Sequence, residues 1–173
     1  MQDNLFFNTS IIPVDILDQL YQEAAVDSNY YESPAVPPVM RCDVSREVRE
    51  YFKKLITVPF RDCGFLKTAT ESVYPLHKDT FRITALNMLM VDPDDDFDTF
   101  MLDINSKGVT RYHVPYVKNQ FMMLNVMNPH GVINKSKEVE RIVLSIGITD
   151  TDYQTCLQKF LKKELFNVTL QKD

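Results

Sequence analysis

The sequence lacks any run of about 18 apolar residues, the length that a membrane-spanning helix needs, so we expect no membrane contact. It begins Met-Gln-Asp-Asn-Leu-Phe-Phe-Asn, without a basic stretch, and we therefore expect no secretory signal peptide. An excess of positive charge is also missing, because 19 Lys and Arg stand against 24 Asp and Glu, for a net charge of −5. This balance disfavours a broad nucleic-acid-binding surface.

Cysteine is scarce as well. The three cysteines, Cys42, Cys63 and Cys156, are odd in number and far apart, and no C-x-x-C pattern occurs. These features exclude a cysteine-based zinc cluster and a disulfide framework. We expect three reduced, mostly buried thiols in a soluble intracellular protein, and we assign it to the cytoplasm.

The length and the composition are those of an ordinary globular domain. The chain has 173 residues, of which 45% are hydrophobic and 25% are charged, which suffices for one domain with its own core. No internal repeat and no long linker divides it. We expect a single domain over residues 1–173, with helical support at 13–56, a strand-rich core at about 60–150 and a C-terminal helix at 153–166.

Apolar residues recur at helical spacing in three segments. Pro13 suits the first turn of the first helix, and Ser45 is a good N-cap for the second. The apolar positions are, in chain order, Ile16, Leu17, Leu20, Tyr21, Ala24, Val48, Tyr51, Phe52, Leu55, Leu157, Phe160, Leu161 and Leu165. A loop rich in Ser, Asn and Pro is expected between the first two helices, at 26–40.

Beyond Pro59 the sequence changes to short strand-like runs separated by turn residues. Many strands with no helices between them favour an antiparallel sandwich or barrel. We predict a mainly β protein with flanking helices, built on a jelly-roll (double-stranded β-helix) of about eight strands. The expected strands are 60–69, 72–77, 81–91, 97–104, 109–114, 119–127 and 139–149.

The residues that suggest chemistry begin with His77 and Asp79. Two positions apart on an extended strand, an imidazole and a carboxylate point to the same side. A second histidine, His130, follows another apolar run in Asn128-Pro-His-Gly131. Two His and one carboxylate on one face of a metal, with the opposite face open, is the arrangement of non-haem Fe(II) oxygenases.

Arg141 opens a strongly apolar run and needs an anionic partner if its head group is buried. Its guanidinium is well shaped to bind a carboxylate through two parallel hydrogen bonds. Ser145, four positions on, shares its face on a strand and offers a hydroxyl to the same carboxylate. Lys78, Arg82 and Arg111 are candidates for the mouth of a pocket, and the sequence does not choose among them.

In order and spacing, Tyr74-x-x-His77-x-Asp79, Arg82, His130, Arg141 and Ser145 resemble the 2-oxoglutarate/Fe(II)-dependent oxygenase superfamily, most closely its prolyl-hydroxylase-like branch. The resemblance covers roughly residues 60–150. It implies that His77, Asp79 and His130 are the catalytic iron ligands and that Arg141, with Ser145, holds the distal carboxylate of 2-oxoglutarate.

The sequence departs from that branch in one place. The branch usually carries a Tyr in the strand after H-x-D that also contacts the cosubstrate, whereas this strand reads Leu86-Asn-Met-Leu-Met90. Asn87 is the polar residue there that can substitute for it. Tyr74 is expected to pack against or position the site.

The activity that the resemblance implies is hydroxylation of a peptidyl residue, such as proline, or of a small molecule such as a free amino acid. It would use Fe(II), 2-oxoglutarate and O2, with ascorbate as a supporting reductant. Two alternatives stay open: a cupin-like metal enzyme with non-oxidative chemistry, and a non-catalytic jelly-roll interaction module. The sequence leaves the oligomeric state and the substrate undetermined.

Overall fold

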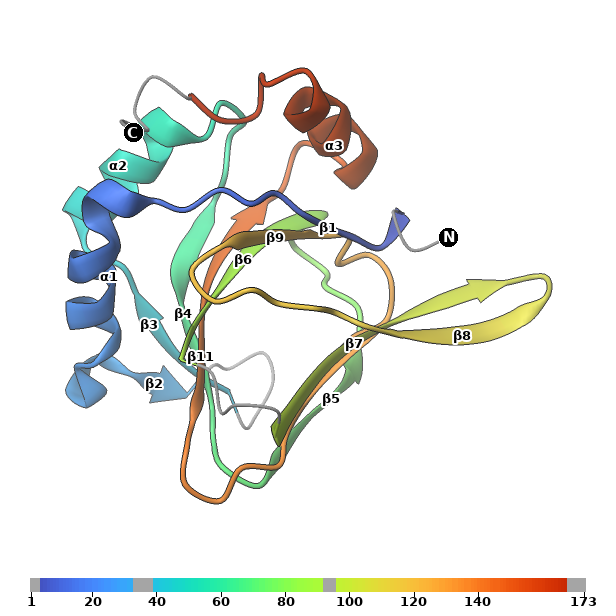
Figure 1. Ribbon diagram of the computed structural model, residues 1–173, viewed down its shortest axis with the longest axis horizontal. Coiled ribbons are helices and arrows are strands. Elements are labelled where there is room, and N and C mark those ends of the chain that lie inside the picture. Colours follow the sequence, from blue (N-terminus) through green and yellow to red (C-terminus); the bar gives the residue numbers. More distant parts are fainter. Residues whose placement is uncertain (1–3, 33–38, 92–95, 168–173) are drawn as a thin grey trace.

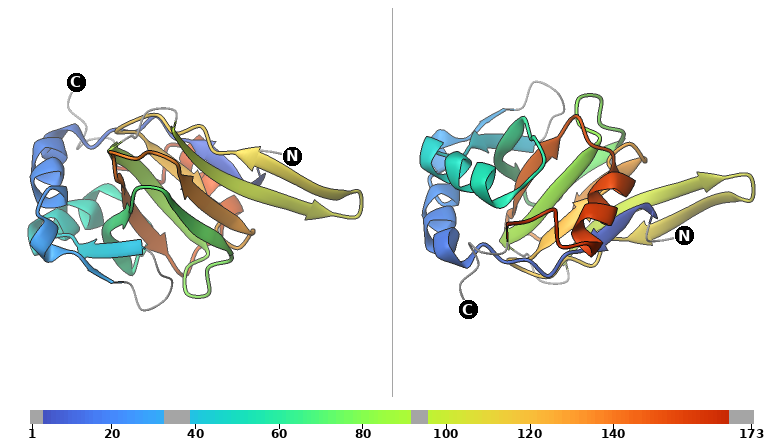
Figure 2. Two further views of the ribbon diagram at one scale, coloured as in Figure 1. Left: turned by 90° about the horizontal axis from the view of Figure 1, so that it is seen from below. Right: turned by 90° about the horizontal axis from the view of Figure 1, so that it is seen from above.

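The computed structural model describes residues 4–32, 39–91 and 96–167. Its strands form two antiparallel sheets that face each other, with three helices on the outside of the larger one (Figures 1 and 2). The mainly β fold predicted from the sequence is confirmed. None of the helices in the described ranges combines the length and apolarity that a bilayer crossing requires.

The larger sheet has seven strands in the order β1-β9-β6-β11-β4-β3-β2. They are β1 (Phe6–Asn8), β9 (Phe121–Leu124), β6 (Thr84–Val91), β11 (Arg141–Ile148), β4 (Asp62–Thr68), β3 (Val39–Asp43) and β2 (Tyr31–Glu32). The smaller sheet has the order β5-β10-β7-β8. Its strands are β5 (Ser72–His77), β10 (His130–Asn134), β7 (Phe97–Asn105) and β8 (Gly108–His113).

The helices are α1 (Leu17–Ala24), α2 (Arg46–Leu55) and α3 (Tyr153–Leu161), with short 3-10 turns η2 (Val14–Ile16) and η3 (Asp27–Asn29). Ser45 caps α2 as predicted, because its side chain accepts a hydrogen bond from the backbone N–H of Val48. The third helix ends earlier than the predicted residue 166. The chain turns at Lys163, where φ is +61°, and Phe166 then forms a β-bridge with Ile56.

Three strands were not expected from the sequence: β2, β3 and β10. Strand β2 and the first two residues of β3 lie within the segment 26–40, which was predicted to be a loop, and residues 33–38 of that segment lie outside the described ranges. β3 reads Val-Met-Arg-Cys-Asp, and pairing along β4 gives this short segment its extended form.

Side-chain alternation on β11 separates the core from the space between the sheets. Leu144, Ile146 and Ile148 point outward and join the core under the three helices. Arg141 and Ser145 therefore point inward, toward the smaller sheet. The same alternation places Asn87 of β6, which pairs with Ser145, on the inner face.

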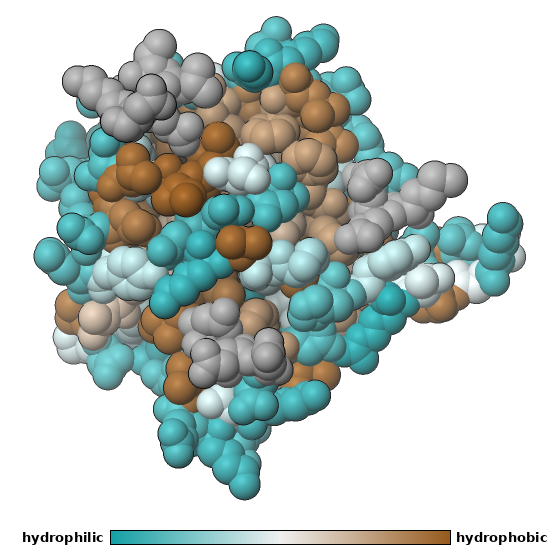
Figure 3. All heavy atoms as spheres, in the orientation of Figure 1, coloured by the Kyte–Doolittle hydropathy of each residue, from teal (hydrophilic) through white to brown (hydrophobic). Residues whose placement is uncertain are grey.

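The hairpin of β7 and β8 extends beyond the body of the molecule as an arm (Figures 1 and 2). Figure 3 shows that this arm and the lower edge of the visible face are largely hydrophilic, while apolar side chains gather in its upper half.

Candidate active site

His77, Asp79 and His130 come together between the sheets. Their ligand atoms all lie within 4.8 Å of one another. His77 ends β5 and His130 begins β10, and the two residues are direct partners in the antiparallel pair. The Nε2 atoms of His77 and His130 lie 3.4 Å and 3.8 Å from Oδ1 of Asp79.

The sequence pattern predicted Asp79 on the same extended strand as His77, but the structure does not place it there. The strand ends at His77, so Asp79 lies in the loop beyond it, and its backbone N–H donates to the carbonyl of Val126. This contact joins the loop to the segment that leads into His130. The hydrogen bond thereby holds the loop that carries Asp79 next to the segment that precedes His130.

Both imidazoles are oriented by the backbone. Nδ1 of His77 lies 2.9 Å from the carbonyl oxygen of Pro75, and Nδ1 of His130 lies 2.9 Å from that of Asn128. A carbonyl only accepts, so each Nδ1 carries the proton and each Nε2 presents a lone pair toward Asp79. Metal-binding histidines in proteins are usually fixed in this way.

The triad fits a metal ion. Two donors at right angles on a metal with bonds of about 2.1 Å are about 3 Å apart. The Nε2–Oδ1 distances of 3.4 Å and 3.8 Å exceed this separation by less than 1 Å. Two imidazoles and one carboxylate, on adjoining segments, are the donors of an iron site with open positions.

The charges around the triad favour metal-binding protonation states. Burial raises the pKa of Asp79, but the neighbouring His77, Arg82 and His130 together outweigh burial and lower this pKa to about 2. Burial lowers the pKa of His130 to about 4, against the opposing effect of Asp79. At neutral pH the carboxylate is therefore ionised and the His130 imidazole is neutral, as metal ligation requires.

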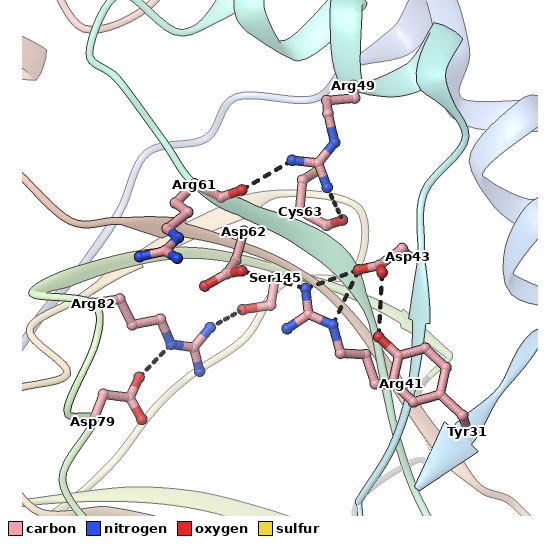
Figure 4. Close-up of polar contacts among 10 residues, drawn as sticks. All are labelled: Tyr31, Arg41, Asp43, Arg49, Arg61, Asp62, Cys63, Asp79, Arg82 and Ser145. Atoms are coloured by element: carbon pink, nitrogen blue, oxygen red, sulfur yellow. Dashed lines mark hydrogen bonds and ion pairs between the residues drawn. The ribbon is translucent and has the colours of Figure 1, made fainter. Parts of the chain in front are cut away.

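Arg82 is one of the three basic residues that the sequence offered as candidates for the mouth of a pocket. Its Nε donates to Oδ2 of Asp79, and its Nη1 donates to Oγ of Ser145 at 2.6 Å (Figure 4). Lys78 and Arg82 both line the pocket beside the triad. Arg111 lies instead on the β7–β8 arm, where it pairs with Asp98 and covers the ring of Phe100.

Arg141, at the start of β11, is buried, with 4% of its surface exposed. Its Nη2 donates to Oγ1 of Thr99 at 3.0 Å. Its guanidinium carbon lies 5.3 Å from the ring centroids of both Phe97 and Tyr116. The head group is thus held between two aromatic walls, facing the space between the sheets.

Ser145 and Asn87 form one hydrogen-bonded chain. Ser145 Oγ donates to Oδ1 of Asn87 at 2.7 Å, and Nδ2 of Asn87 donates to the hydroxyl of Tyr116 at 3.3 Å. Tyr116 comes from the segment after β8 and had no signal in the sequence, because it lies outside any periodic run. A phenol hydroxyl therefore lies beside Asn87, on the strand where the prolyl-hydroxylase-like branch usually carries its Tyr.

Tyr74, also on β5, packs edge-on against His77 with ring centroids 4.4 Å apart. It lines a pocket of about 320 Å³ together with His77 and Asp79 of the triad. The third histidine, His113, lies on the arm and pairs with Asp98, apart from the triad.

Comparison with known proteins finds solved structures that share this fold. No family model matches the sequence, and the comparison with curated proteins found no match. Among solved structures, a Pseudomonas putida prolyl-4-hydroxylase has a TM-score of 0.58 at 14% identity, covering 84% of this chain and 91% of that one.

Two further structures are similar. SnoN, a non-heme alpha ketoglutarate dependent epimerase from nogalamycin biosynthesis, has a TM-score of 0.58 at 11% identity, covering 82% of this chain and 74% of that one. A 2OG-Fe(II) oxygenase family protein from Burkholderia pseudomallei has a TM-score of 0.50 at 11% identity, covering 79% and 81%. The fold is that of the 2-oxoglutarate/Fe(II) oxygenases, with a double-stranded β-helix core, as the sequence resemblance implied.

Proposed function

We propose that the protein is an Fe(II)- and 2-oxoglutarate-dependent oxygenase that hydroxylates a small molecule or a peptidyl residue. The observation that carries the proposal is the triad. Two imidazoles with Nδ1 bound to backbone carbonyls direct their Nε2 atoms at the same oxygen of Asp79. The overall reaction is R–H + O2 + 2-oxoglutarate → R–OH + succinate + CO2, in which one oxygen atom enters each organic product.

In this proposal His77, Asp79 and His130 hold the iron. When bound, Fe(II) supplies the activation of O2 that is coupled to oxidative decarboxylation of 2-oxoglutarate. Arg82 binds the second oxygen of Asp79 and so directs the first toward the imidazoles. This second contact fixes the orientation of the ligand, as outer-shell partners of metal sites generally do.

Arg141 is the proposed partner of the distal carboxylate of 2-oxoglutarate. Its place on the inner face, its position between two aromatic rings and the two parallel donors of its guanidinium suit a carboxylate there. Ser145, Asn87 and Tyr116 add polar groups along the same inner face. We assign these three residues to positioning of the cosubstrate. Arg141 with Ser145 in this place favours the oxygenase over a non-oxidative cupin-like enzyme or a non-catalytic module.

The proposal is tested by release of succinate from 2-oxoglutarate in the presence of Fe(II) and ascorbate, with and without candidate substrates. Wild type should turn over 2-oxoglutarate, and His77→Ala and Asp79→Ala should not. His113→Ala is the matched control, because it removes an exposed histidine of the arm and should leave turnover unchanged.

Binding and product mass complete the test. Calorimetry with Mn(II), and then with 2-oxoglutarate on the Mn(II)-loaded protein, should show both bind wild type, and the triad variants should lose Mn(II). Hydroxylation adds the mass of one oxygen atom to the substrate, whereas epimerisation leaves its mass unchanged. A wild-type protein that binds neither Mn(II) nor 2-oxoglutarate would refute the proposal.

A further inference from the structure

The pocket beside the triad has a second wall that the proposed iron and 2-oxoglutarate sites do not use. This wall is formed by the inner faces of β3 and β4. It presents two apolar side chains, Val39 and Leu66, and two oppositely charged ones, Arg41 and Asp62. Tyr74 and Phe81 line the pocket on the side of the triad, and Lys78 adds a second cation.

Arg41 is held in place from behind. Its Nε and Nη2 donate to Oδ1 of Asp43 at 3.1 Å and 2.9 Å, and Tyr31 donates to the other oxygen of Asp43 at 3.2 Å (Figure 4). Within the described part of the chain, Nη1 of Arg41 makes no hydrogen bond. The guanidinium is therefore fixed while one of its nitrogens stays available to a ligand.

Asp62 is the anion of this wall. Its Oδ1 lies 3.6 Å from Nη2 of Arg41, which is an ion pair but beyond hydrogen-bond distance. Among the described residues, no side chain donates a hydrogen bond to this carboxylate. Lys78 is exposed and has no ion pair in the same ranges. The pocket therefore offers one carboxylate, Asp62, that accepts no side-chain hydrogen bond within the described ranges, and it is also lined by two cations, Arg41 and Lys78.

This charged wall adjoins the metal triad. A methyl group on Gly147 would lie 3.0 Å from Cδ of Arg82 and 3.3 Å from Cβ of Asp62, so both side chains lie over Gly147. Arg82 in turn binds Asp79 (Figure 4). A molecule that contacts Asp62 and Arg41 therefore extends toward the iron ligands.

We propose that the substrate is a free amino acid, which places its ammonium group on Asp62 and its carboxylate on Arg41 and Lys78. In an amino acid the nitrogen and the carboxylate carbon are about 2.5 Å apart, which suits two protein groups separated by 3.6 Å. The side chain then lies among Val39, Leu66, Tyr74 and Phe81, facing the triad. This inference rests on the proposed function.

A residue inside a peptide fits this wall poorly. Its nitrogen and carbonyl are neutral amide groups, so binding would remove water from Arg41 and Asp62 without supplying a charged partner to either. The pocket volume of about 320 Å³ is also at the small end of the range of ligand sites, which suits one amino acid.

The first experiment measures succinate release with the twenty free L-amino acids supplied singly, with Fe(II), 2-oxoglutarate and ascorbate. At least one with an aliphatic, cyclic or aromatic side chain should raise succinate release at least tenfold over the substrate-free rate. Its N-acetyl form and its amide form, each lacking one charge, should lose that stimulation. Stimulation by peptides but by no free amino acid, or equal stimulation by the blocked forms, would overturn the inference.

Charge-selective variants test the two contacts separately. Asp62→Asn should raise the KM for the responding amino acid at least tenfold, more than the KM for 2-oxoglutarate, and should reduce discrimination against the N-acetyl form. Arg41→Gln should instead reduce discrimination against the amide form. A merely structural role would not produce this crossed pattern. The control is Glu50→Gln, which replaces an exposed acid on α2 paired with Lys53. It should change discrimination against neither the N-acetyl form nor the amide form.

The failures of the two proposals are distinguishable. If Mn(II) and 2-oxoglutarate bind and substrate-free turnover is measurable, but no free amino acid stimulates it, the amino-acid inference is wrong and the oxygenase proposal stands. If neither ligand binds, both are wrong. Thermal melting of each variant shows whether a lost response reflects unfolding, and Asp62→Asn, which preserves shape, keeps the test decisive if Arg41→Gln does not fold.

Discussion

Arg82 binds one carboxylate oxygen of Asp79, Oδ2, while the other oxygen, Oδ1, faces the Nε2 atoms of both His77 and His130. The two oxygens therefore have separate partners. Held in this way, the carboxylate would present Oδ1 to a bound metal while Oδ2 stays on Arg82. Arg82 also donates to Ser145, so the same side chain connects the triad to the chain of Ser145, Asn87 and Tyr116.

Replacing Arg82 by Gln should weaken metal binding without removing a ligand. Loss of an outer-shell partner typically costs about 10–100-fold in metal affinity, and we expect a loss in that range. The measurement is calorimetric titration with Mn(II) at neutral pH. Arg111→Gln removes an arginine–aspartate pair on the arm and should leave the affinity unchanged; equal affinities for wild type and Arg82→Gln would contradict the role given to Arg82.

The metal-free protein should lose stability as the pH falls from about 6.5 to about 4, because of His130. The folded-state pKa of His130 is about 4, below the ordinary value of 6.5, so the unfolded chain binds more protons in this window. Stability therefore falls as the pH is lowered, by at most about 3 kcal/mol for a shift of this size.

The measurement is urea unfolding of the metal-free protein between pH 7 and pH 4. His130→Asn, which cannot titrate, should show a shallower dependence over the same window. Asp79 adds its own loss below its unfolded value of 3.8, because its folded-state pKa is about 2. If the free energy of unfolding changes with pH equally in wild type and His130→Asn above pH 4, the dependence does not come from His130.

The sequence predicted the strand-rich core and the three helices because these depend on local periodicity and capping. It did not predict β10, which carries His130. That strand is short, follows the turn residues Asn128 and Pro129, and contains Gly131, so local propensity does not mark it as extended. Pairing with β5 and β7 makes it a strand and places His130 opposite His77.

Local sequence patterns also did not predict the contacts of Arg82 and Tyr116. Arg82 lies three residues after Asp79, but only the bend of that loop directs it at the carboxylate rather than at solvent. Tyr116 lies in the segment between β8 and β9 and reaches Asn87 of β6 from 29 residues away in the sequence. Contacts of this kind follow from how the sheets face each other, which no local pattern in the sequence encodes.

Arg141→Lys should reduce the affinity for 2-oxoglutarate and spare the metal site. Lysine keeps the charge but loses the planar fork that binds a carboxylate through two hydrogen bonds. Hydrogen bonds to charged groups contribute about 1.5–3 kcal/mol, so we expect roughly tenfold to hundredfold weaker binding. Calorimetry with 2-oxoglutarate on the Mn(II)-loaded variant measures this, and Mn(II) affinity serves as the internal control.

Tyr116→Phe should raise the KM for 2-oxoglutarate several-fold. The change removes the hydroxyl that accepts from Asn87 but keeps the ring beside Arg141, so packing is preserved. A lost neutral hydrogen bond is worth about 0.5–1.5 kcal/mol, or roughly twofold to tenfold. Tyr112→Phe, on β8, is the matched control, and an unchanged KM in Tyr116→Phe would exclude a part for this hydroxyl in cosubstrate binding.

Gly131→Ala should disturb the fold and the metal site together. A methyl group at this position would lie 2.8 Å from Cζ of Phe100 and 3.1 Å from the carbonyl oxygen of Tyr74, closer than packed atoms tolerate. Either β5 or Phe100 must then move, at a cost of about 1–3 kcal/mol. Movement of β5 would separate His77 from His130, so urea unfolding and Mn(II) titration should both show a loss.

Adding Phe100→Leu should restore most of the stability, measured against Phe100→Leu alone. If it restores stability but not Mn(II) affinity, the strain falls on β5, and the spacing of the two imidazoles depends on the absence of a side chain at residue 131.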